Sequence, residues 1–328
     1  MSVNPPSGLR HTRNAPANLV RYFAVPVTAW AVLGALLLGL EVYVLASWAM
    51  DGGYRLASTA SAGKSDGPVR AIDVMAPLSA VLGAALLALY LYRRYRIKQR
   101  LDFDTLLFAA LLLASWQSPL MNWFHPVLVA NTHVLGAVGS WGPYMPGWQG
   151  FGSHQEAELP LVTLSISVSA LLAVLACSKI MTLIMDRWPG TSRVRLVLSG
   201  FLLAVLVDAA EPLLTFLGVV AWSRAVPEVT LWSGNWYQFP LYQMLATGLF
   251  TGALSALRCL RNVQGESWLE RGAVRLPPAI RPWARLLAVV GGTNAALTLY
   301  TGLHILVSLV DGAPPAHLPD YFRPPTAY

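Results

Sequence analysis

The sequence is dominated by long apolar runs, which polar or basic segments separate. A helix needs about 20 apolar residues to cross a hydrocarbon core of roughly 30 Å, because all of its backbone polar groups must be paired within the segment. Seven runs approach or exceed that length, and they cover residues 23–50, 72–92, 103–117, 159–185, 196–220, 240–257 and 286–310. The pattern predicts an all-α integral membrane protein with about seven transmembrane helices.

The third run is interrupted. Ser118 and Pro119 end its uniform apolar stretch, and residues 120–135 continue as a half-apolar segment that carries Asn122 and His125. Proline removes a backbone donor and disfavours helix continuation, and non-helical backbone at membrane depth is tolerated where protein buries it. We therefore expect a broken or re-entrant segment after the third helix.

A second irregular stretch, residues 141–152, combines Trp, Tyr and Phe with several Gly and Pro. Gly and Pro set the backbone of turns, and aromatic side chains bury large areas. The composition predicts an ordered extracytoplasmic loop over residues 119–158. An aromatic belt at the lipid interface explains the same residues equally well.

Composition supports the membrane prediction. Hydrophobic residues make up 55% of the 328 residues and charged residues only 12%, whereas soluble domains carry about 25% charged residues. So little charge cannot cover a globule of this size, and so many apolar residues exclude a disordered chain. The first run is too long for a signal peptide, so we interpret it as an uncleaved anchor.

The net charge of +7 is unevenly distributed. Lys and Arg gather before the first run and in the loops around residues 93–100, 187–195 and 258–285, whereas residues 119–160 contain none. Cytoplasmic loops carry the excess of basic residues, so we expect an N-in/C-out topology in a bacterial plasma membrane. The basic loops are interpreted as topology determinants near lipid phosphate and not as a nucleic-acid site.

These assignments give a simple organisation. Residues 1–22 are the predicted cytoplasmic N-terminal tail, residues 23–310 a single transmembrane helical domain, and residues 311–328 an extracytoplasmic C-terminal tail. Membrane lipids and a lipophilic small molecule are the expected partners.

Ionisable groups inside apolar runs are costly unless they face a cavity or a partner, so they are the first candidates for a site. Glu41, Asp208, Glu211 and His304 lie within the predicted spans, and Glu158 lies at the outer boundary. Asp208 and Glu211 are three residues apart, which places them on one face of a helix. Their positions predict a pocket that opens towards the outer side.

Two carboxyls within one helical turn cannot both ionise cheaply in a low-dielectric cavity, so one of them is expected to keep a proton. A protonated carboxyl can act as a general acid, and its ionised neighbour can accept a proton or stabilise a cation. The alternative is structural: Asp208 and Glu211 would then only hydrogen-bond neighbouring helices.

Other chemistries find little support. The sequence contains no Gly-rich phosphate loop, no Gly-x-Ser-x-Gly nucleophile elbow and no His-Glu-x-x-His motif. The last run has no lysine for a retinal Schiff base, and the spacing of His125 and His133 is not diagnostic of a metal site. We predict neither a metal nor a cofactor.

Several motifs together resemble the AveC-like spirocyclase family of avermectin-type polyketide pathways. They are Trp-Gln-Ser-Pro-Leu-Met-Asn at 116–122, Gly-Ser-Trp at 139–141, Pro-Gly-Trp at 146–148, Glu-Leu-Pro at 158–160 and Asp-Arg-Trp-Pro at 186–189. Members of this family often carry an acidic residue at the position of Ser118. The resemblance implies a membrane-embedded cyclase that closes a dihydroxy-ketone into a spiroketal, in some members with dehydration.

The prediction from the residues fits this chemistry, because spiroketal closure passes through an oxocarbenium-like cation that a protonated carboxyl can generate. We assign Asp208 and Glu211 as acid and partner carboxylate, with Glu41 and Glu158 as secondary catalytic candidates. The expected substrate-binding residues are Trp116, Asn122, His125, Trp141, Trp148 and His304. A membrane terpene or meroterpenoid cyclase, and a non-catalytic lipid-binding or proton-coupled transport protein, remain alternatives.

Overall fold

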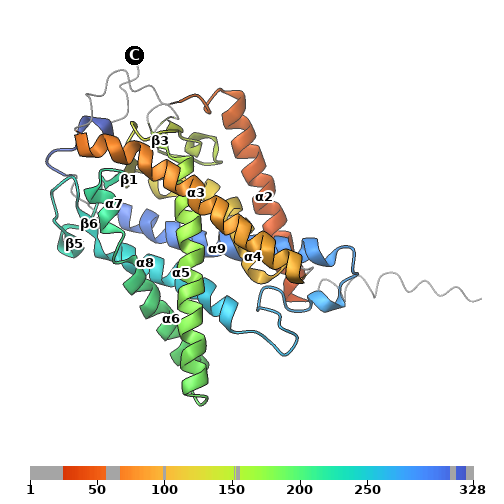
Figure 1. The fold of residues 1–328 in the computed structure, drawn as a ribbon. Helices are drawn as coiled ribbons and strands as arrows, with labels where there is room; N and C mark the ends of the chain where they lie inside the picture. Colours follow the sequence, from red (N-terminus) through yellow and green to blue (C-terminus); the bar gives the residue numbers. More distant parts are fainter. Residues whose placement is uncertain are drawn as a thin grey trace, which may run out of the picture.

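The computed structural model describes residues 25–56, 67–98, 101–150, 152, 156–310 and 315–322. The predicted N-terminal tail, residues 1–22, lies outside the described residues, as do 311–314 and 323–328 of the predicted C-terminal tail. The described chain is mostly helical, as the apolar runs predict. Short strands and the small helix α7 gather at one end of the helices, and the loop that follows α8 lies at the other end (Figure 1).

Six helices of the described chain are long and apolar enough to cross a membrane. They are α2 (Pro26–Met50), α3 (Gly67–Lys98), α4 (Phe103–Ala114) with the 3-10 helix η1 (Ser115–Asn122), α5 (Pro160–Arg187), α6 (Arg193–Asp208) with α7 (Pro212–Phe216), and α9 (Arg281–Ser308). The remaining predicted span is α8 (Leu241–Cys259), which is 19 residues long but carries Gln243, Thr247 and Ser255 among its apolar residues. It is not among the six.

Two of the helical segments are broken. The α-helix of α4 ends at Ala114 and continues as η1, which contains Pro119, so the interruption lies where the sequence suggests it. The second break separates α6 from α7 after Asp208, in front of Pro212. Proline has no N–H to donate to the preceding turn, which explains why the α6 hydrogen-bond pattern does not run through this position. Asp208 and Glu211 therefore flank a helix break and do not lie within one continuous helix.

Among the described residues, three small antiparallel pairs of strands shape the end of the molecule that we call the cap, defined here as the described residues of 123–158 and 219–240. They join β1 (Leu128–Ala130) to β4 (Val220–Trp222), β2 (Val138–Gly139) to β3 (Ala157–Glu158), and β5 (Thr230–Leu231) to β6 (Phe239–Pro240). The segment 315–322, with the 3-10 helix η5 (Asp320–Phe322), packs against this cap: the Tyr321 carbonyl accepts from the Thr132 N–H at 3.0 Å, and Phe322 is buried. Pairing between distant segments gives the cap a defined shape.

The apolar core lies where α4 packs against α5 and α9. Leu106 and Leu107 of α4 meet Leu171 of α5 and Val289 of α9 there, all of them buried. At the other side of α9, α2 approaches closely through Gly34 and Gly291. Small residues allow such backbone contact between helices in a bilayer.

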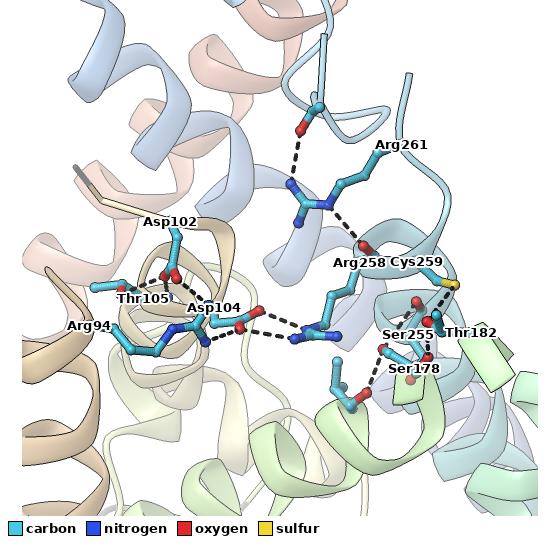
Figure 2. Close-up of polar contacts among 12 residues, drawn as sticks. Arg94, Asp102, Asp104, Thr105, Ser178, Thr182, Ser255, Arg258, Cys259 and Arg261 are labelled. Carbon is cyan, nitrogen blue, oxygen red and sulfur yellow. Dashed lines mark hydrogen bonds and ion pairs between the residues drawn. The ribbon is translucent and has the colours of Figure 1, made fainter. Parts of the chain in front are cut away.

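Opposite the cap, the ends of three helices are joined by ion pairs (Figure 2). Asp104 at the start of α4 is 3% exposed and lies between two guanidinium groups. Arg258 donates to both of its carboxylate oxygens, at 2.7 and 3.0 Å, and Arg94 donates at 2.6 Å. Asp104 thus connects the ends of α3, α4 and α8.

We expect Gly34→Ala to destabilise the protein by about 1–3 kcal/mol, because overpacking a close contact forces backbone shifts. A Cβ at Gly34 would overlap the carbonyl oxygen of Leu287, whereas a Cβ at Gly39 on the same helix would meet nothing within 4 Å. Thermal unfolding of the purified protein in detergent would measure both substitutions. Gly39→Ala is the matched control and should leave the melting temperature unchanged or raise it; equal effects of the two would contradict the α2–α9 contact.

Candidate functional site

The structure places the predicted polar residues in two groups. The first, which we call the cap cluster, consists of Ser118, Asn122, Ser140, Glu156 and Glu158. The second, the inner cluster, consists of Asp208, Glu211, Gln243, Thr247 and Tyr300. Each group contains two carboxyls. None of the hydrogen bonds among the described residues joins one carboxyl pair to the other.

Glu158 is the centre of the cap cluster. Its two carboxyl oxygens each accept a hydrogen bond from a serine hydroxyl, Ser118 at 2.8 Å and Ser140 at 3.1 Å. Ser118 belongs to η1 and Ser140 follows β2, whose Val138 pairs with Glu158 on β3. The 3-10 turn and the strand pair thus fix the carboxyl between two hydroxyl donors, and Glu158 is only 8% exposed.

Glu156 lies two residues before Glu158 in the same extended segment, so both side chains lie on one face. The Asn122 side-chain amide donates to Glu156 Oε2 at 3.5 Å, while Glu156 Oε1 is buried without a hydrogen-bond partner among the described residues. The oxygen of the same Asn122 side chain accepts from the N–H groups of Val127 and Leu128 at 2.8 and 3.1 Å. Asn122 is therefore locked in place beside Glu156.

Burial shifts the protonation of both cap carboxyls. Loss of solvent, together with the nearby charge of Glu158, raises the pKa of Glu156 to about 8, against the opposing effect of the Asn122 hydrogen bond. Burial also raises the pKa of Glu158 to about 7, although the hydroxyls of Ser118 and Ser140 favour its ionised form. At neutral pH, Glu156 is accordingly mostly protonated, and Glu158 is available as a carboxylate.

Tryptophans pack beside the cap cluster. The Trp141 Nε1–H donates to the Trp116 carbonyl at 2.6 Å, and the Trp116 Nε1–H donates to Asn294 Oδ1 of α9 at 3.1 Å. The Trp148 ring lies edge-on to Trp123, with centroids 5.7 Å apart. Trp116 and Trp141 share one buried cluster, so these predicted wall residues do come together.

The inner cluster joins α6, α8 and α9. The Asp208 and Glu211 carboxyls are neighbours at the break between α6 and α7, and the Gln243 amide donates to Glu211 Oε2 at 2.7 Å. Tyr300 of α9 donates its hydroxyl to Gln243 Oε1 at 3.0 Å. The packing of α8 and α9 against α6 thus connects Gln243 and Tyr300 to the Glu211 side chain.

The remaining predicted residues are separate from both carboxyl pairs. Glu41 is buried in α2, between Leu40 and Val44, which pack with Trp116 and Trp141, and its Oε2 has no hydrogen-bond partner among the described residues. His125 is partly exposed in the cap. His304 is fully buried among aromatic rings.

Sequence reasoning missed Glu156, Gln243 and Tyr300 as site residues. The signal for Glu156 was its spacing of two from Glu158, which places both side chains on one face of an extended segment. Nothing in the sequence pairs Gln243 with Tyr300, because their contact depends on how α8 and α9 pack. Among the described residues no three His, Cys, Asp or Glu side chains gather as metal ligands would.

Fold and site together define a mostly helical protein whose described residues include six helices long and apolar enough to cross a membrane and two buried pairs of carboxyls. The chain belongs to the AveC-like spirocyclase family, because the family model described as "Spirocyclase AveC-like" matches residues 98–328. This confirms the resemblance that the motifs suggest and implies a spirocyclase-type function. No curated protein and no solved structure shows a significant match to the chain. The matched region contains both carboxyl pairs, whereas Glu41 lies outside it.

Proposed function

We propose that this protein is a membrane-embedded acid–base cyclase that closes a lipophilic dihydroxy-ketone into a spiroketal, with the cap cluster as its catalytic site. The observation that carries the proposal is that residues of three separate sequence motifs meet at Glu158. Three sequence motifs of the family resemblance meet there, since Ser118 and Ser140 donate to the Glu158 carboxyl and Trp141 donates to Trp116. The inner cluster brings together no comparable set of motif residues.

The chemistry follows from the different protonation of the two carboxyls. Glu156, protonated at neutral pH, donates its proton to the departing hydroxyl of a hemiketal, which leaves as water. The resulting oxocarbenium ion is stabilised by the Glu158 carboxylate. The second substrate hydroxyl then attacks the cationic carbon and releases its proton to Glu158. One water is lost overall, and proton exchange with solvent restores both carboxyls.

The other residues of the cap cluster, and the tryptophans beside it, serve this pair. Asn122 positions the Glu156 carboxyl, and the two serines keep the carboxylate of Glu158 oriented. Trp116 and Trp141 supply apolar walls that exclude water from the cation. The six apolar helices support placement in a bilayer, where an apolar substrate also concentrates.

We expect a bell-shaped dependence of kcat/KM on pH, with its optimum between about 7 and 8. Activity falls as the pH rises through about 8, because Glu156 loses the proton that it must donate. It falls below about 7, because Glu158 becomes protonated and cannot accept a proton. Purified protein in lipid nanodiscs, incubated with an acyclic dihydroxy-ketone and analysed by chromatography, would measure this after subtraction of the enzyme-free reaction. A profile without either limb between about pH 6 and pH 9 would contradict the assignment.

A second candidate function is proton-coupled transport of a lipophile. The neighbouring carboxyls of Asp208 and Glu211, within the span Arg193–Phe216, favour it, because ionisable side chains within membrane helices often mark proton relays. Proton-driven uptake into vesicles that is lost in Asp208→Asn, without any chemical change in the transported molecule, would support transport over cyclisation. A terpene cyclase would use the protonated Glu156 carboxyl to protonate an alkene. Incubation of the protein with a polyene and with a dihydroxy-ketone, in parallel, would distinguish a terpene cyclase from a spiroketal cyclase.

A further inference from the structure

A second group of buried polar atoms lies at the outer end of α9, away from the cap carboxyls. His304 is 0% exposed and Trp222 is 1% exposed. Both ring nitrogens of His304 and the Nε1 of Trp222 lack a hydrogen-bond partner among the described residues. A buried polar group without a partner costs about 1–3 kcal/mol, so three such atoms in neighbouring rings require an explanation.

The two rings face each other within an aromatic enclosure. The Trp222 and His304 centroids are 5.4 Å apart, and Tyr242 and Tyr300 surround the imidazole at 5.8 and 5.0 Å. Trp222 is held from its backbone, because it ends β4 opposite Leu128 and its carbonyl accepts from Gln238 Nε2 at 2.8 Å. The ring positions are thus determined by the fold and not by hydrogen bonds of the ring nitrogens themselves.

A cleft lies next to this enclosure. It is lined by Val127, Arg224, Ala225, Val226, Tyr242, Val307 and Ser308. Tyr242 belongs to both the cleft and the enclosure, and Ser308 lies one helical turn after His304 on the same face of α9. The cleft therefore adjoins the aromatic enclosure of the imidazole.

We propose that His304 and Trp222 form a binding site for the hydroxyl group of an uncharged lipophile. Indole Nε1 is a donor only, whereas a neutral imidazole offers one donor and one acceptor. A hydroxyl oxygen accepts from the Trp222 N–H and its hydrogen is donated to the acceptor nitrogen of His304, so one group pairs with two of the three unpartnered atoms. A charged group between the two rings is disfavoured, because burial among aromatic rings removes its hydration.

The proposal does not depend on the cyclase chemistry, because it concerns binding and involves different residues. Its polar atoms lie on β4 and α9, and Glu156 and Glu158 make no hydrogen bond to them. Binding can therefore be tested with molecules that do not react.

The test is an NMR titration. Protein labelled with ¹⁵N-tryptophan in detergent micelles is titrated separately with 1-decanol, 2-decanone and decane, and the indole N–H resonances are followed. The Trp222 indole resonance is assigned by its loss in Trp222→Phe, which keeps an aromatic ring. We expect decanol to shift this resonance saturably and with about tenfold higher affinity than decane, the gain of a formed hydrogen bond. The indole of Trp188, which is 58% exposed, is the internal control and should not shift.

The variant His304→Phe should weaken decanol binding about tenfold while the other indole resonances keep their positions. Decanone can only accept a hydrogen bond, so it should bind more weakly than decanol. Equal affinities for decanol and decane, or no response of the Trp222 resonance, would overturn the site. Equal affinities for decanol and decanone would overturn the assignment of a hydroxyl. The wild-type titration decides these points even if a variant fails to fold.

Discussion

Glu156→Gln is expected to lower kcat for ring closure about 100-fold or more, since general acid catalysis contributes about 10²–10⁴ to rate. The substitution preserves shape and the contact with Asn122, but an amide cannot donate a proton to a leaving hydroxyl. Substrate binding should change little, so the loss should appear in kcat and not in KM. Steady-state product formation in nanodiscs measures both.

The neighbouring Glu158→Gln should also lower kcat, and it should have a second effect that a structural role would not produce. The charge of Glu158 contributes to the raised pKa of Glu156, so its removal should move the alkaline limb of the pH profile to lower pH. Glu228→Gln, at an exposed position of the cap, is the matched control and should retain full activity. If Asp208→Asn abolished turnover while Glu156→Gln kept it, the inner cluster would be the catalytic site.

Asp104→Asn is expected to cost about 3 kcal/mol of stability, because it leaves two guanidinium groups facing an uncharged amide. This value is at the low end for buried ion pairs, since the side chains of Arg94 and Arg258 are 24% and 26% exposed. Thermal unfolding in detergent would register it as a clear fall in melting temperature.

The matched control for Asp104→Asn is Asp102→Asn, the same substitution two residues earlier in the chain. Asp102 accepts from the Thr105 N–H at the start of α4, and asparagine caps a helix equally well. Asp102→Asn removes its ion pair with the partly exposed Arg94, and loss of such an exposed pair should cost no more than about 1 kcal/mol. Equal losses in the two variants would show that Asp104 does not connect the three helix ends.

The long helices could be predicted from the sequence because an apolar run of bilayer length has few other stable conformations. The weakest of these predictions is α8, and the structure indicates why. Gln243 and Thr247 of this helix face the inner cluster, which lowers the hydropathy of a helix that packs against α5, α6 and α9. Polar residues that belong to a buried hydrogen-bond network lower the mean hydropathy of their helix, so the helix is harder to recognise as a membrane span.

The cap could be predicted only in part. The aromatic and turn-forming residues of 141–152 indicated order, but strand pairs of two or three residues leave no periodic pattern. The hydrogen bonds of Glu158 join residues 18 and 40 positions apart, and no local rule gives such contacts. The sequence predicts Asp208 and Glu211 as the main catalytic pair because they lie deep in a predicted span. Depth in a span does not identify a carboxyl such as Glu156, which loops of the cap bury.

The proposed mechanism requires that Glu156, in the cap, stays protonated at neutral pH. Infrared difference spectroscopy of the protein in nanodiscs, recorded as the pH is raised, measures the carbonyl stretch of protonated carboxyls directly. We predict a band that disappears with a midpoint at about 8 and is absent in Glu156→Gln. A wild-type spectrum that matches that of Glu156→Gln at neutral pH, with this carboxyl already ionised, would contradict the account.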